Sequence, residues 1–295
     1  MSMRNDRSDS RTVSTRVSRV WYAVRAMCRF GRFRGFPGVS RPFGAPTTTA
    51  PPRRSRLDDH RVSPVSQEAL KRGAAQTAFS SVESGMVLGL GTGSTVRHLV
   101  DLLGEALRSG ALADIVAVPT SVQTEVQARD VGIPLVDLGG CEALDLTIDG
   151  ADEVSPELDL IKGLGGALLR EKMVAQASHR LLIIADDSKL VDRLGTRAPL
   201  PVEVVDWALD AQTRFLESAG ATVELRSSPG AVPVKSDNGN VFLDCTFPQG
   251  IEDPAALEHL LSYRAGIIET GLFLGMAGEA VIASPNGIQT LRRAP

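Results

Sequence analysis

The sequence predicts an α/β protein with a Rossmann-like, open and mostly parallel sheet and a second, smaller α+β domain. Apolar runs typical of strands alternate with segments of helical periodicity between residues 66 and 189, and this alternation requires parallel strands joined by right-handed crossovers. After residue 200 the order becomes strand, helix, strand, strand, helix, strand, which is the βαββαβ order of a ferredoxin-like domain. With 295 residues, 43% of them hydrophobic, the chain can bury both cores.

The first part of the folded body alternates helices and strands. Ser66 stands before a segment with apolar residues at helical spacing and is a candidate helix cap. Short apolar runs bounded by Gly, Pro or Asp are typical of buried strands. We expect strands over residues 85–90, 115–119, 134–136, 144–149, 158–161 and 180–185, and helices over 69–82, 96–107, 121–130 and 167–178.

The second part carries the smaller domain. We expect strands over residues 202–205, 222–225, 241–246 and 267–269 and helices over 208–218 and 254–262, with the turn 238–240 leading into the third strand. The chain is then expected to return to the first sheet through 271–274 and 280–283. The predicted domains are therefore a catalytic Rossmann-like domain of residues 63–200 plus 271–295 and a small α+β domain of residues 201–270.

Residues 1–57 differ from the rest in charge. They hold thirteen arginines against two aspartates, a net charge of +11, whereas the remainder has a net charge of −14. We expect residues 1–62 to be a disordered Arg-rich extension, and the open explanations are an organelle transit peptide or a start codon assigned too far upstream. A nucleic-acid-binding arm is a weaker third explanation, because the segment has no recognisable reading helix. The predicted location is accordingly the cytoplasm, with a plastid as the alternative. The acidic body argues against nucleic-acid partners, since phosphate neutralisation needs clustered Lys and Arg.

Composition excludes several other classes. No run approaches the roughly 20 apolar residues that a membrane-spanning helix needs. Cys28, Cys141 and Cys245 lie far apart without the spacing of a zinc site or a disulfide framework, so we expect a reducing compartment and no metal. The four histidines, His60, His98, His179 and His259, show no triad or ligand pattern and are expected to be structural or on the surface. Ser94 and Ser188 lack the context of a nucleophile elbow.

A glycine-rich loop at residues 89–95 follows a strand and opens a helix. Amides and hydroxyls at such a helix end can hold a phosphate, although the loop could also be a plain tight turn. Its glycines at 89, 91 and 93 do not match the dinucleotide pattern, and no lysine follows to make a P-loop. The strand at 115–119 also ends without the acidic residue that would bind a ribose.

Charged side chains gather between residues 149 and 172. Asp149 and Asp152 follow a predicted buried strand, where ligands bind in open α/β sheets, or they form a solvated turn. Lys162 and Glu171 flank a glycine-rich turn and are either an exposed ion pair or part of a site where bare backbone approaches a ligand. Lys189 follows another strand and is a second candidate cation for a phosphate, or a surface lysine.

Four motifs in this order resemble the type A ribose-5-phosphate isomerase family. They are Gly-Leu-Gly-Thr-Gly-Ser-Thr at 89–95, Asp-Gly-Ala-Asp-Glu at 149–153, Lys-Gly-Leu-Gly-Gly-Ala-Leu-Leu-Arg-Glu-Lys at 162–172 and Ala-Asp-Asp-Ser-Lys at 185–189. The resemblance covers residues 66–293. It implies interconversion of D-ribose 5-phosphate and D-ribulose 5-phosphate in the pentose phosphate pathway, without cofactor or metal, by a homodimer or homotetramer.

The resemblance also assigns residues. It implies that Glu171 is the catalytic base, that Lys162 supplies positive charge, that Asp149 assists ring opening and that Asp152 orients hydroxyls or Lys162. The implied substrate contacts are Thr92, Gly93, Ser94, Thr95, Asp149, Gly150, Ala151, Asp152, Lys162, Gly163, Leu164, Gly165 and Lys189. Leu164 stands where many bacterial members have glycine; because its amide is kept, we expect altered loop packing without loss of chemistry.

Three alternatives share this general architecture. A sugar-phosphate-sensing regulator should carry a helix-turn-helix ahead of residue 66, and the Pro- and Arg-rich lead shows none. A nucleotide-dependent oxidoreductase is disfavoured by the missing glycine and acidic residue described above. An acyl-CoA transferase would need a nucleophilic glutamate loop and a larger site for the thioester carrier.

Overall fold

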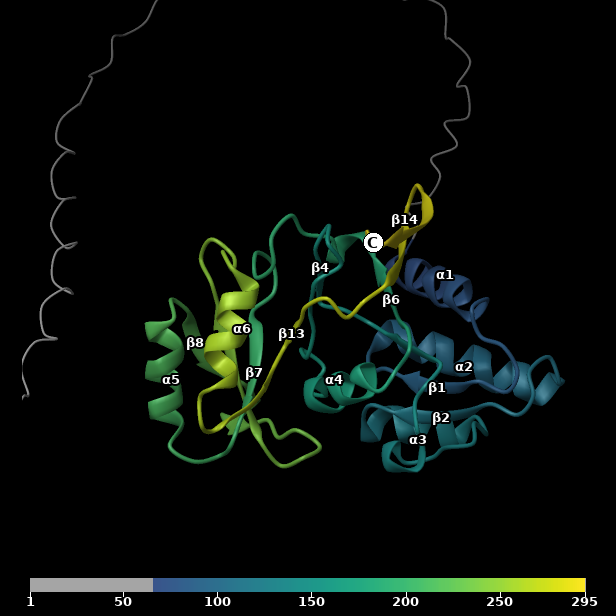
Figure 1. Ribbon diagram of the computed structural model, residues 1–295, viewed down its shortest axis with the longest axis horizontal. Helices are drawn as coiled ribbons and strands as arrows, with labels where there is room; N and C mark the ends of the chain where they lie inside the picture. Colours follow the sequence, from purple (N-terminus) through teal and green to yellow (C-terminus); the bar gives the residue numbers. More distant parts are fainter. Residues whose placement is uncertain (1–65, 295) are drawn as a thin grey trace, which may run out of the picture. The chain divides into compact units, whose positions relative to one another are not determined.

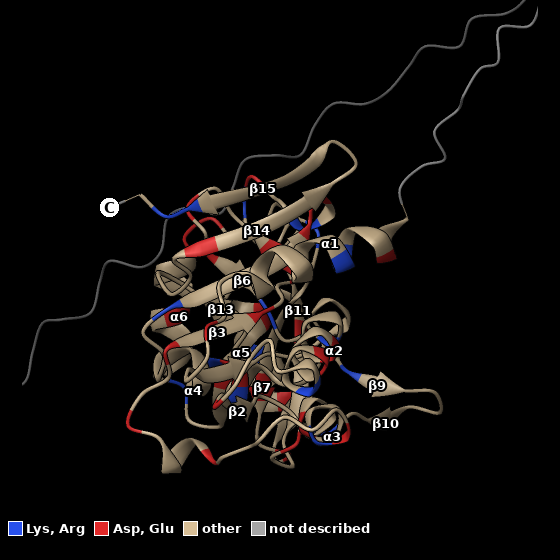
Figure 2. Ribbon diagram, turned by 90° about the vertical axis from the view of Figure 1, so that its right-hand side faces the viewer, with Lys and Arg blue, Asp and Glu red and all other residues tan. Residues whose placement is uncertain are grey.

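The computed structural model describes residues 66–294, which belong to one compact unit, and the predictions for residues 1–62 lie outside them. Its largest sheet has six strands in the order β15-β14-β6-β3-β1-β2, all parallel except β15, which pairs antiparallel with β14. Figure 2 shows β15, β14 and β6 in succession at one edge. The strands are β1 (Val87–Leu90), β2 (Val116–Pro119), β3 (Leu146–Asp149), β6 (Leu181–Asp186), β14 (Glu279–Ser284) and β15 (Gly287–Arg292). The predicted α/β class is confirmed.

Helices cover the faces of this sheet. They are α1 (Gln67–Phe79), α2 (Ser94–Ser109), α3 (Val122–Asp130) and α4 (Leu168–Gln176), with short 3₁₀ turns η1 (Leu138–Gly140) and η2 (Asp187–Lys189). The predicted cap is present: the Oγ of Ser66 accepts a hydrogen bond from the amide of Ala69 at 3.2 Å. Figure 1 shows α4 between the first sheet with its helices and the region of α5 (Leu209–Ser218) and α6 (Pro254–Ser262).

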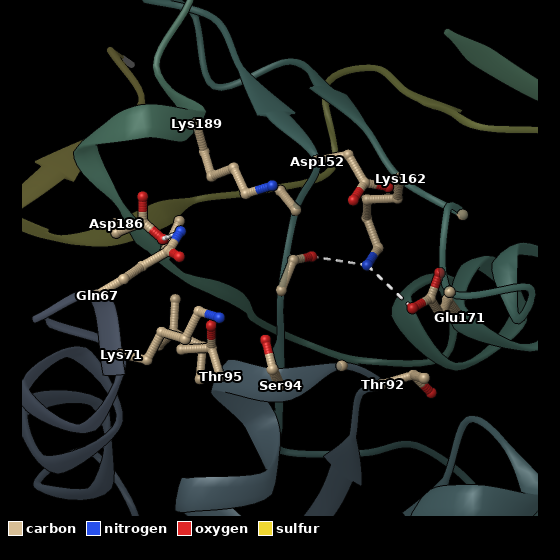
Figure 3. A pocket seen from close by; sticks show the side chains of 17 residues that line it. Gln67, Lys71, Thr92, Ser94, Thr95, Asp152, Lys162, Glu171, Asp186 and Lys189 are labelled. Carbon is tan, nitrogen blue, oxygen red and sulfur yellow. Dashed lines mark hydrogen bonds and ion pairs between the residues drawn. The ribbon is translucent and has the colours of Figure 1, made fainter. Parts of the chain in front are cut away.

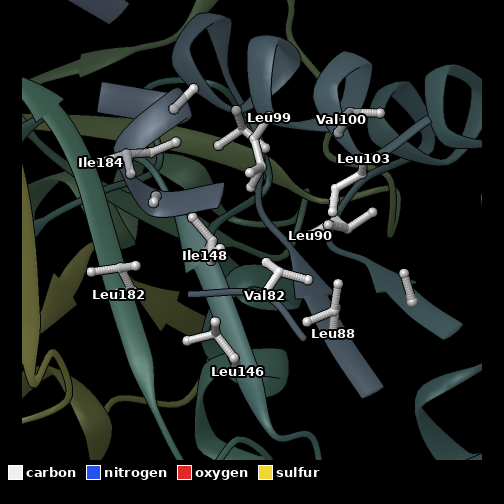
Figure 4. Close-up of a cluster of buried hydrophobic side chains, with 14 of the residues drawn as sticks. Val82, Leu88, Leu90, Leu99, Val100, Leu103, Leu146, Ile148, Leu182 and Ile184 are labelled. Carbon is white, nitrogen blue, oxygen red and sulfur yellow. The ribbon is translucent and has the colours of Figure 1, made fainter. Parts of the chain in front are cut away.

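The main apolar core lies between the sheet and helices α1 and α2 (Figure 4). Leu99 and Leu103 of α2 pack against leucines and isoleucines of β1, β3 and β6. All of β3 is buried, as expected for a central parallel strand with both faces covered. Gly89 lies so close to Thr147 on β3 and Val174 on α4 that any side chain there would collide with them. This packing fixes where β1 and β3 end, which is where the site forms.

The second sheet has four antiparallel strands in the order β12-β7-β11-β8. They are β7 (Leu200–Val204), β8 (Thr222–Leu225), β11 (Val241–Thr246) and β12 (Ile267–Thr270). Together with α5 and α6 they follow the predicted order βαββαβ along the chain. If the four strands are numbered in chain order, their spatial order in the sheet is 4-1-3-2. A hairpin of β9 (Ser227–Ser228) and β10 (Val232–Pro233), visible in Figure 2, was not predicted. The division into domains at residues 200 and 271 stays a proposal.

A third sheet of three very short strands, in the order β13-β5-β4, joins the two parts. The strands are β4 (Glu153–Val154), β5 (Leu160–Ile161) and β13 (Leu272–Phe273). The amide of Asp152 donates to the carbonyl of Ile161 at 2.8 Å, so Asp152 and Lys162 emerge side by side. The predicted strand at 134–136 is only a bridge between Leu135 and Ala117. None of the helices within residues 66–294 is long and apolar enough to span a membrane.

Candidate active site

A cavity of about 150 Å³ lies at the carboxyl ends of β1, β3 and β6 (Figure 3). Ligands bind at this edge of open parallel sheets. It is lined by Gln67, Lys71, Thr92, Gly93, Ser94, Thr95, Gly150, Ala151, Asp152, Lys162, Gly163, Gly165, Glu171, Ile184, Ala185, Asp186 and Lys189. The motifs singled out from the sequence therefore meet in one cavity. Of the predicted contact residues, Asp149 lies behind its wall and Leu164 points to solvent.

The glycine loop leads from β1 into α2. Gly93 stands at the helix cap with φ +119°, a conformation that favours glycine, and it has no side chain to bond the first-turn amides. Those amides face the cavity together with Ser94 and Thr95, which makes this helix end suited to an anion. Gly91 packs directly against Asp149, whose Oδ1 accepts the amide of Thr92 at 3.0 Å.

Buried hydroxyls hold the glycine loop from behind. The Oγ1 of Thr92 lies 2.8 Å from the hydroxyls of Thr120 and Ser121. Thr124 donates to the carbonyl of Gly91 at 2.8 Å, so α3 contributes to the loop's conformation. Because each buried hydroxyl has a partner, the network fixes the loop without the cost of an unsatisfied polar group.

A cluster of one cation and two carboxylates occupies the other side of the cavity. The Nζ of Lys162 lies 3.0 Å from Oδ2 of Asp149 and 3.3 Å from Oε1 of Glu171, and it donates to the carbonyl of Gly150 at 2.7 Å. The side chains are between 1% and 5% exposed, so water screens these charges little. The Oε2 of Glu171 is buried and has no hydrogen-bond partner among the described residues.

Burial and mutual repulsion change the acidity of this cluster. Burial raises the pKa of Asp149, although Lys162 opposes the shift. Burial and the charges of Asp149 and Asp152 raise the pKa of Glu171 to about 8, against the lowering effect of Lys162. Burial alone would lower the pKa of Lys162, but the neighbouring carboxylates outweigh it and the pKa rises, so the ammonium stays charged. A carboxyl that titrates near neutrality beside a permanent cation suits proton transfer.

The turn after β5 connects Lys162 to the helix that bears Glu171. Gly163 and Gly166 have φ of +103° and +80°, conformations that side chains disfavour. The Oδ2 of Asp152 accepts the amide of Leu164 at 2.9 Å, while the Leu164 side chain is 40% exposed. Leucine in place of glycine therefore leaves this amide in use.

Five lining residues are absent from the predicted contacts, and three of them are polar or charged: Gln67, Lys71 and Asp186, beside the apolar Ile184 and Ala185. Lys71 is half-buried on α1, one turn after Gln67, whereas the adjacent Arg72 is exposed. Gln67 lies 3.5 Å from Asp186, and Asp186 in turn accepts the amide of Ser188 at 3.1 Å. No local motif marks Lys71, because its place depends on how α1 packs against the sheet.

The remaining candidates lie apart from the cavity. Nε2 of His98 lies 2.8 Å from Glu68, and His259 packs its ring edge-on against Tyr263. His179 and Ser188 do not line the cavity. Within residues 66–294, no group of three or more His, Cys, Asp or Glu side chains could hold a metal ion.

Comparisons with known proteins all find ribose 5-phosphate isomerases. The family model for ribose 5-phosphate isomerase A (phosphoriboisomerase A) matches residues 116–287. Ribose-5-phosphate isomerase A of Chloroflexus aurantiacus is 52% identical over 76% of this chain and 94% of its own length. Probable ribose-5-phosphate isomerase 3, chloroplastic, of Arabidopsis thaliana is 46% identical over 78% of this chain and 85% of its own.

A solved D-ribose-5-phosphate isomerase in complex with phospho-erythronic acid superposes with a TM-score of 0.75. It is 40% identical, and the match covers 77% of this chain and 100% of that one. The resemblance inferred from four sequence motifs is therefore confirmed, and the chain belongs to the ribose 5-phosphate isomerase A family.

Proposed function

We propose that the chain interconverts D-ribose 5-phosphate and D-ribulose 5-phosphate through an enediolate, with Glu171 as the base. Its family makes it an aldose–ketose isomerase. The observation that carries the proposed mechanism is the buried carboxylate of Glu171, which lines the cavity and has one oxygen beside Lys162 and the other without a hydrogen-bond partner among the described residues. A base of this kind must reach the substrate and needs a pKa near the working pH.

The phosphate of the substrate would bind at the α2 end of the cavity. First-turn amides, the hydroxyls of Ser94 and Thr95, and two lysines from different elements, Lys71 and Lys189, line this part (Figure 3). Both the helix dipole and the lysines favour a dianion there. With the phosphate held at this end, the aldehyde end of the sugar extends toward Lys162 and Glu171.

Proton transfer is the chemical step proposed for Glu171. The carboxylate removes the proton from C2 and returns it to C1, while the O2 hydroxyl gives up its proton and O1 gains one. The electron pair passes through an enediolate whose oxygens carry the negative charge. Lys162, which stays charged, and the amides of the glycine turn stabilise that charge. Asp152 holds the turn through the Leu164 amide and so orients these donors.

Ring opening must precede proton transfer, because the sugar phosphate is mainly a furanose in solution. We assign this step to Asp149, acting through Lys162. The carboxyl is ion-paired to Lys162 at 3.0 Å, and its raised pKa suits it to exchange a proton. The amides of Thr92 and Gly150 hold its other oxygen in place.

The test is isomerisation of ribose 5-phosphate by the purified chain in excess EDTA. Activity is expected for the wild type and for a control variant, Glu217→Gln, which changes an exposed glutamate on α5. Glu171→Gln should bind the substrate but lose turnover. If the wild type shows no isomerase activity, the proposed function is wrong. If Glu171→Gln turns over at the normal rate, the proposed mechanism is wrong. A protein that binds the sugar phosphate without isomerase activity would favour the alternative, a sugar-phosphate-sensing regulator.

We further propose a homodimer or homotetramer located in the cytoplasm, with a plastid as the alternative if residues 1–57 are a transit peptide. The Arabidopsis relative is named as a chloroplastic protein. Light scattering of the purified chain gives the subunit number. Amino-terminal sequencing of the native protein distinguishes a cleaved from a retained extension.

A further inference from the structure

Arg226 reaches from the four-stranded sheet to the glycine turn of the site. It follows β8, and its Nη1 donates to the carbonyls of Gly163 at 3.0 Å and Leu164 at 3.2 Å. These two residues lie between Lys162 and the helix of Glu171. Arg226 itself does not line the cavity, so any effect on chemistry must act through the turn.

The guanidinium is held rigidly on its own side. Asp244 on β11 accepts hydrogen bonds from both Nε and Nη2, at 2.9 and 2.5 Å. The guanidinium also lies 4.6 Å from the ring centroid of Phe242, a fully buried residue two positions earlier on β11. The two hydrogen bonds to one carboxylate and the stacking on the ring fix the orientation of the Arg226 guanidinium, so that its Nη1 is directed at the glycine turn.

Holding the carbonyls also directs the amides of the same peptide groups. In a trans peptide the C=O and N–H point in opposite directions, so carbonyls that face Arg226 turn the amides of Leu164 and Gly165 away from it. The Leu164 amide accordingly donates to Asp152. Gly165 lines the cavity, where its amide is one of the donors proposed above for the enediolate. A turn that contains Gly163 at φ +103° has little conformational preference of its own and needs such support.

We propose that Arg226 is a positioning residue for the isomerisation, holding the glycine turn so that its amides meet the charge of the enediolate. This inference rests on the proposed function. It gives the four-stranded sheet a part in the reaction, although that sheet contributes no cavity-lining residue. The role requires the several donors of arginine, because the guanidinium bonds Asp244 and the two turn carbonyls at once. Because those turn contacts are to backbone atoms, the role does not depend on the side chain at position 164.

The test compares Arg226→Met with Arg264→Met. Arg264 is a matched control, because it lies between α6 and β12, in the same part of the chain as the four-stranded sheet. Its guanidinium lies 4.7 Å from the ring centroid of Phe215 and donates to Gln212 at 3.1 Å, but it makes no hydrogen bond to the glycine turn. Arg226→Met should lower kcat about 10- to 100-fold, somewhat below the loss of a direct oxyanion donor, and change KM less than about threefold. Arg264→Met should keep both constants, whatever its effect on the melting temperature.

Two further measurements separate positioning from general damage. Arg226→Lys, which keeps the charge but lacks the fork, should fall between wild type and Arg226→Met, and millimolar guanidinium should partly restore Arg226→Ala. Phospho-erythronic acid, whose carboxylate can occupy the place of the enediolate oxygens, should bind Arg226→Met more weakly than wild type in calorimetry. An active wild type with unchanged kcat and unchanged phospho-erythronic acid binding in Arg226→Met would overturn this inference and leave the proposed function intact. An inactive wild type would overturn the proposed function and this inference with it.

Discussion

The Nζ of Lys162 lies 3.3 Å from Oε1 of Glu171, and both side chains are almost completely buried. The two residues come from opposite ends of one glycine turn, Lys162 directly after β5 and Glu171 in the first turn of α4. The pair couples a permanent positive charge to a carboxyl of raised pKa, and Asp149 at 3.0 Å completes the cluster. The pH dependence, stability and catalytic power of the site are expected to depend on this pair.

The pH dependence follows from Glu171. Its carboxylate form is the base, and because its pKa is raised to about 8, the active fraction increases as pH rises toward that value. We expect kcat/KM to rise about tenfold per pH unit on the acid side and to level off above about pH 8. The substrate phosphate titrates near about pH 6, so its inflection can be distinguished. A profile that is flat from about pH 6 to 9 would contradict this prediction.

Removing the central cation should damage both activity and stability. In Lys162→Met two buried carboxyls lose their cationic partner, which should lower the free energy of unfolding by about 3–5 kcal/mol at a pH where both are ionised. The substitution raises the pKa values of these carboxyls further, so the loss relative to the wild type grows as pH rises through the wild-type Glu171 pKa of about 8 and shrinks at lower pH, where the carboxyl is protonated in both proteins. Urea unfolding at several pH values measures this effect.

The Lys162→Met variant should also have a kcat about 10²- to 10³-fold lower than the wild type, as expected when a donor to a developing oxyanion is removed. Lys235→Met serves as the control, because it breaks an ion pair with Asp206 in which both side chains are about half exposed. That surface pair should change the free energy of unfolding by less than about 1 kcal/mol. Equal losses in the two variants would show that the buried cluster has no special role.

The phosphate end of the cavity makes a separate prediction about affinity. Lys71→Gln should raise KM for ribose 5-phosphate about 10- to 100-fold, since a hydrogen bond to a charged group contributes about 1.5–3 kcal/mol, and kcat should change less. Arg72→Gln, at the adjacent exposed position on α1, should leave KM unchanged. If both variants raise KM equally, the effect is one of net charge and Lys71 does not contact the phosphate.

The hydroxyl network behind the glycine loop should be needed for stability as well as geometry. Thr124→Val keeps the side-chain shape but leaves the buried carbonyl of Gly91 without its 2.8 Å partner. We expect a loss of about 1–3 kcal/mol in the free energy of unfolding, the cost of an unsatisfied buried polar group. Thr222→Val, at an exposed position on β8, is the control and should cost less than about 0.5 kcal/mol. Equal stabilities in chemical unfolding would contradict the assignment.

Local patterns carried most of what could be predicted. The parallel strands are short apolar runs bounded by turn residues, and α2 has a clear helical periodicity, so α2, β3 and α4 were predicted close to their observed bounds. The two-residue strand β4 is too short to show a period, and the pairing partner of β5, which lies within the predicted strand 158–161, is β13, more than a hundred positions later. The sequence therefore suggested that Asp152 and Lys162 meet, but it could not supply the reason.

Candidate site residues divide in the same way. Those inside glycine-rich motifs, such as Thr92 and Glu171, stood out because the backbone around them is unusual. Lys71 lies in an ordinary helix, and Arg226 follows an ordinary strand, so neither has a local signal. Their relation to the site arises from packing between distant segments, which no pattern of nearby residues encodes.

The most direct test of the central claim is proton exchange at C2 of ribose 5-phosphate in D₂O, followed by NMR. The wild type should replace the C2 proton with deuterium as the substrate interconverts, because the proton held by Glu171 can exchange with solvent between the two halves of the reaction. Glu171→Gln should bind the substrate with similar affinity and leave the C2 proton signal unchanged. Exchange at the wild-type rate in Glu171→Gln would contradict the assignment of Glu171 as the base.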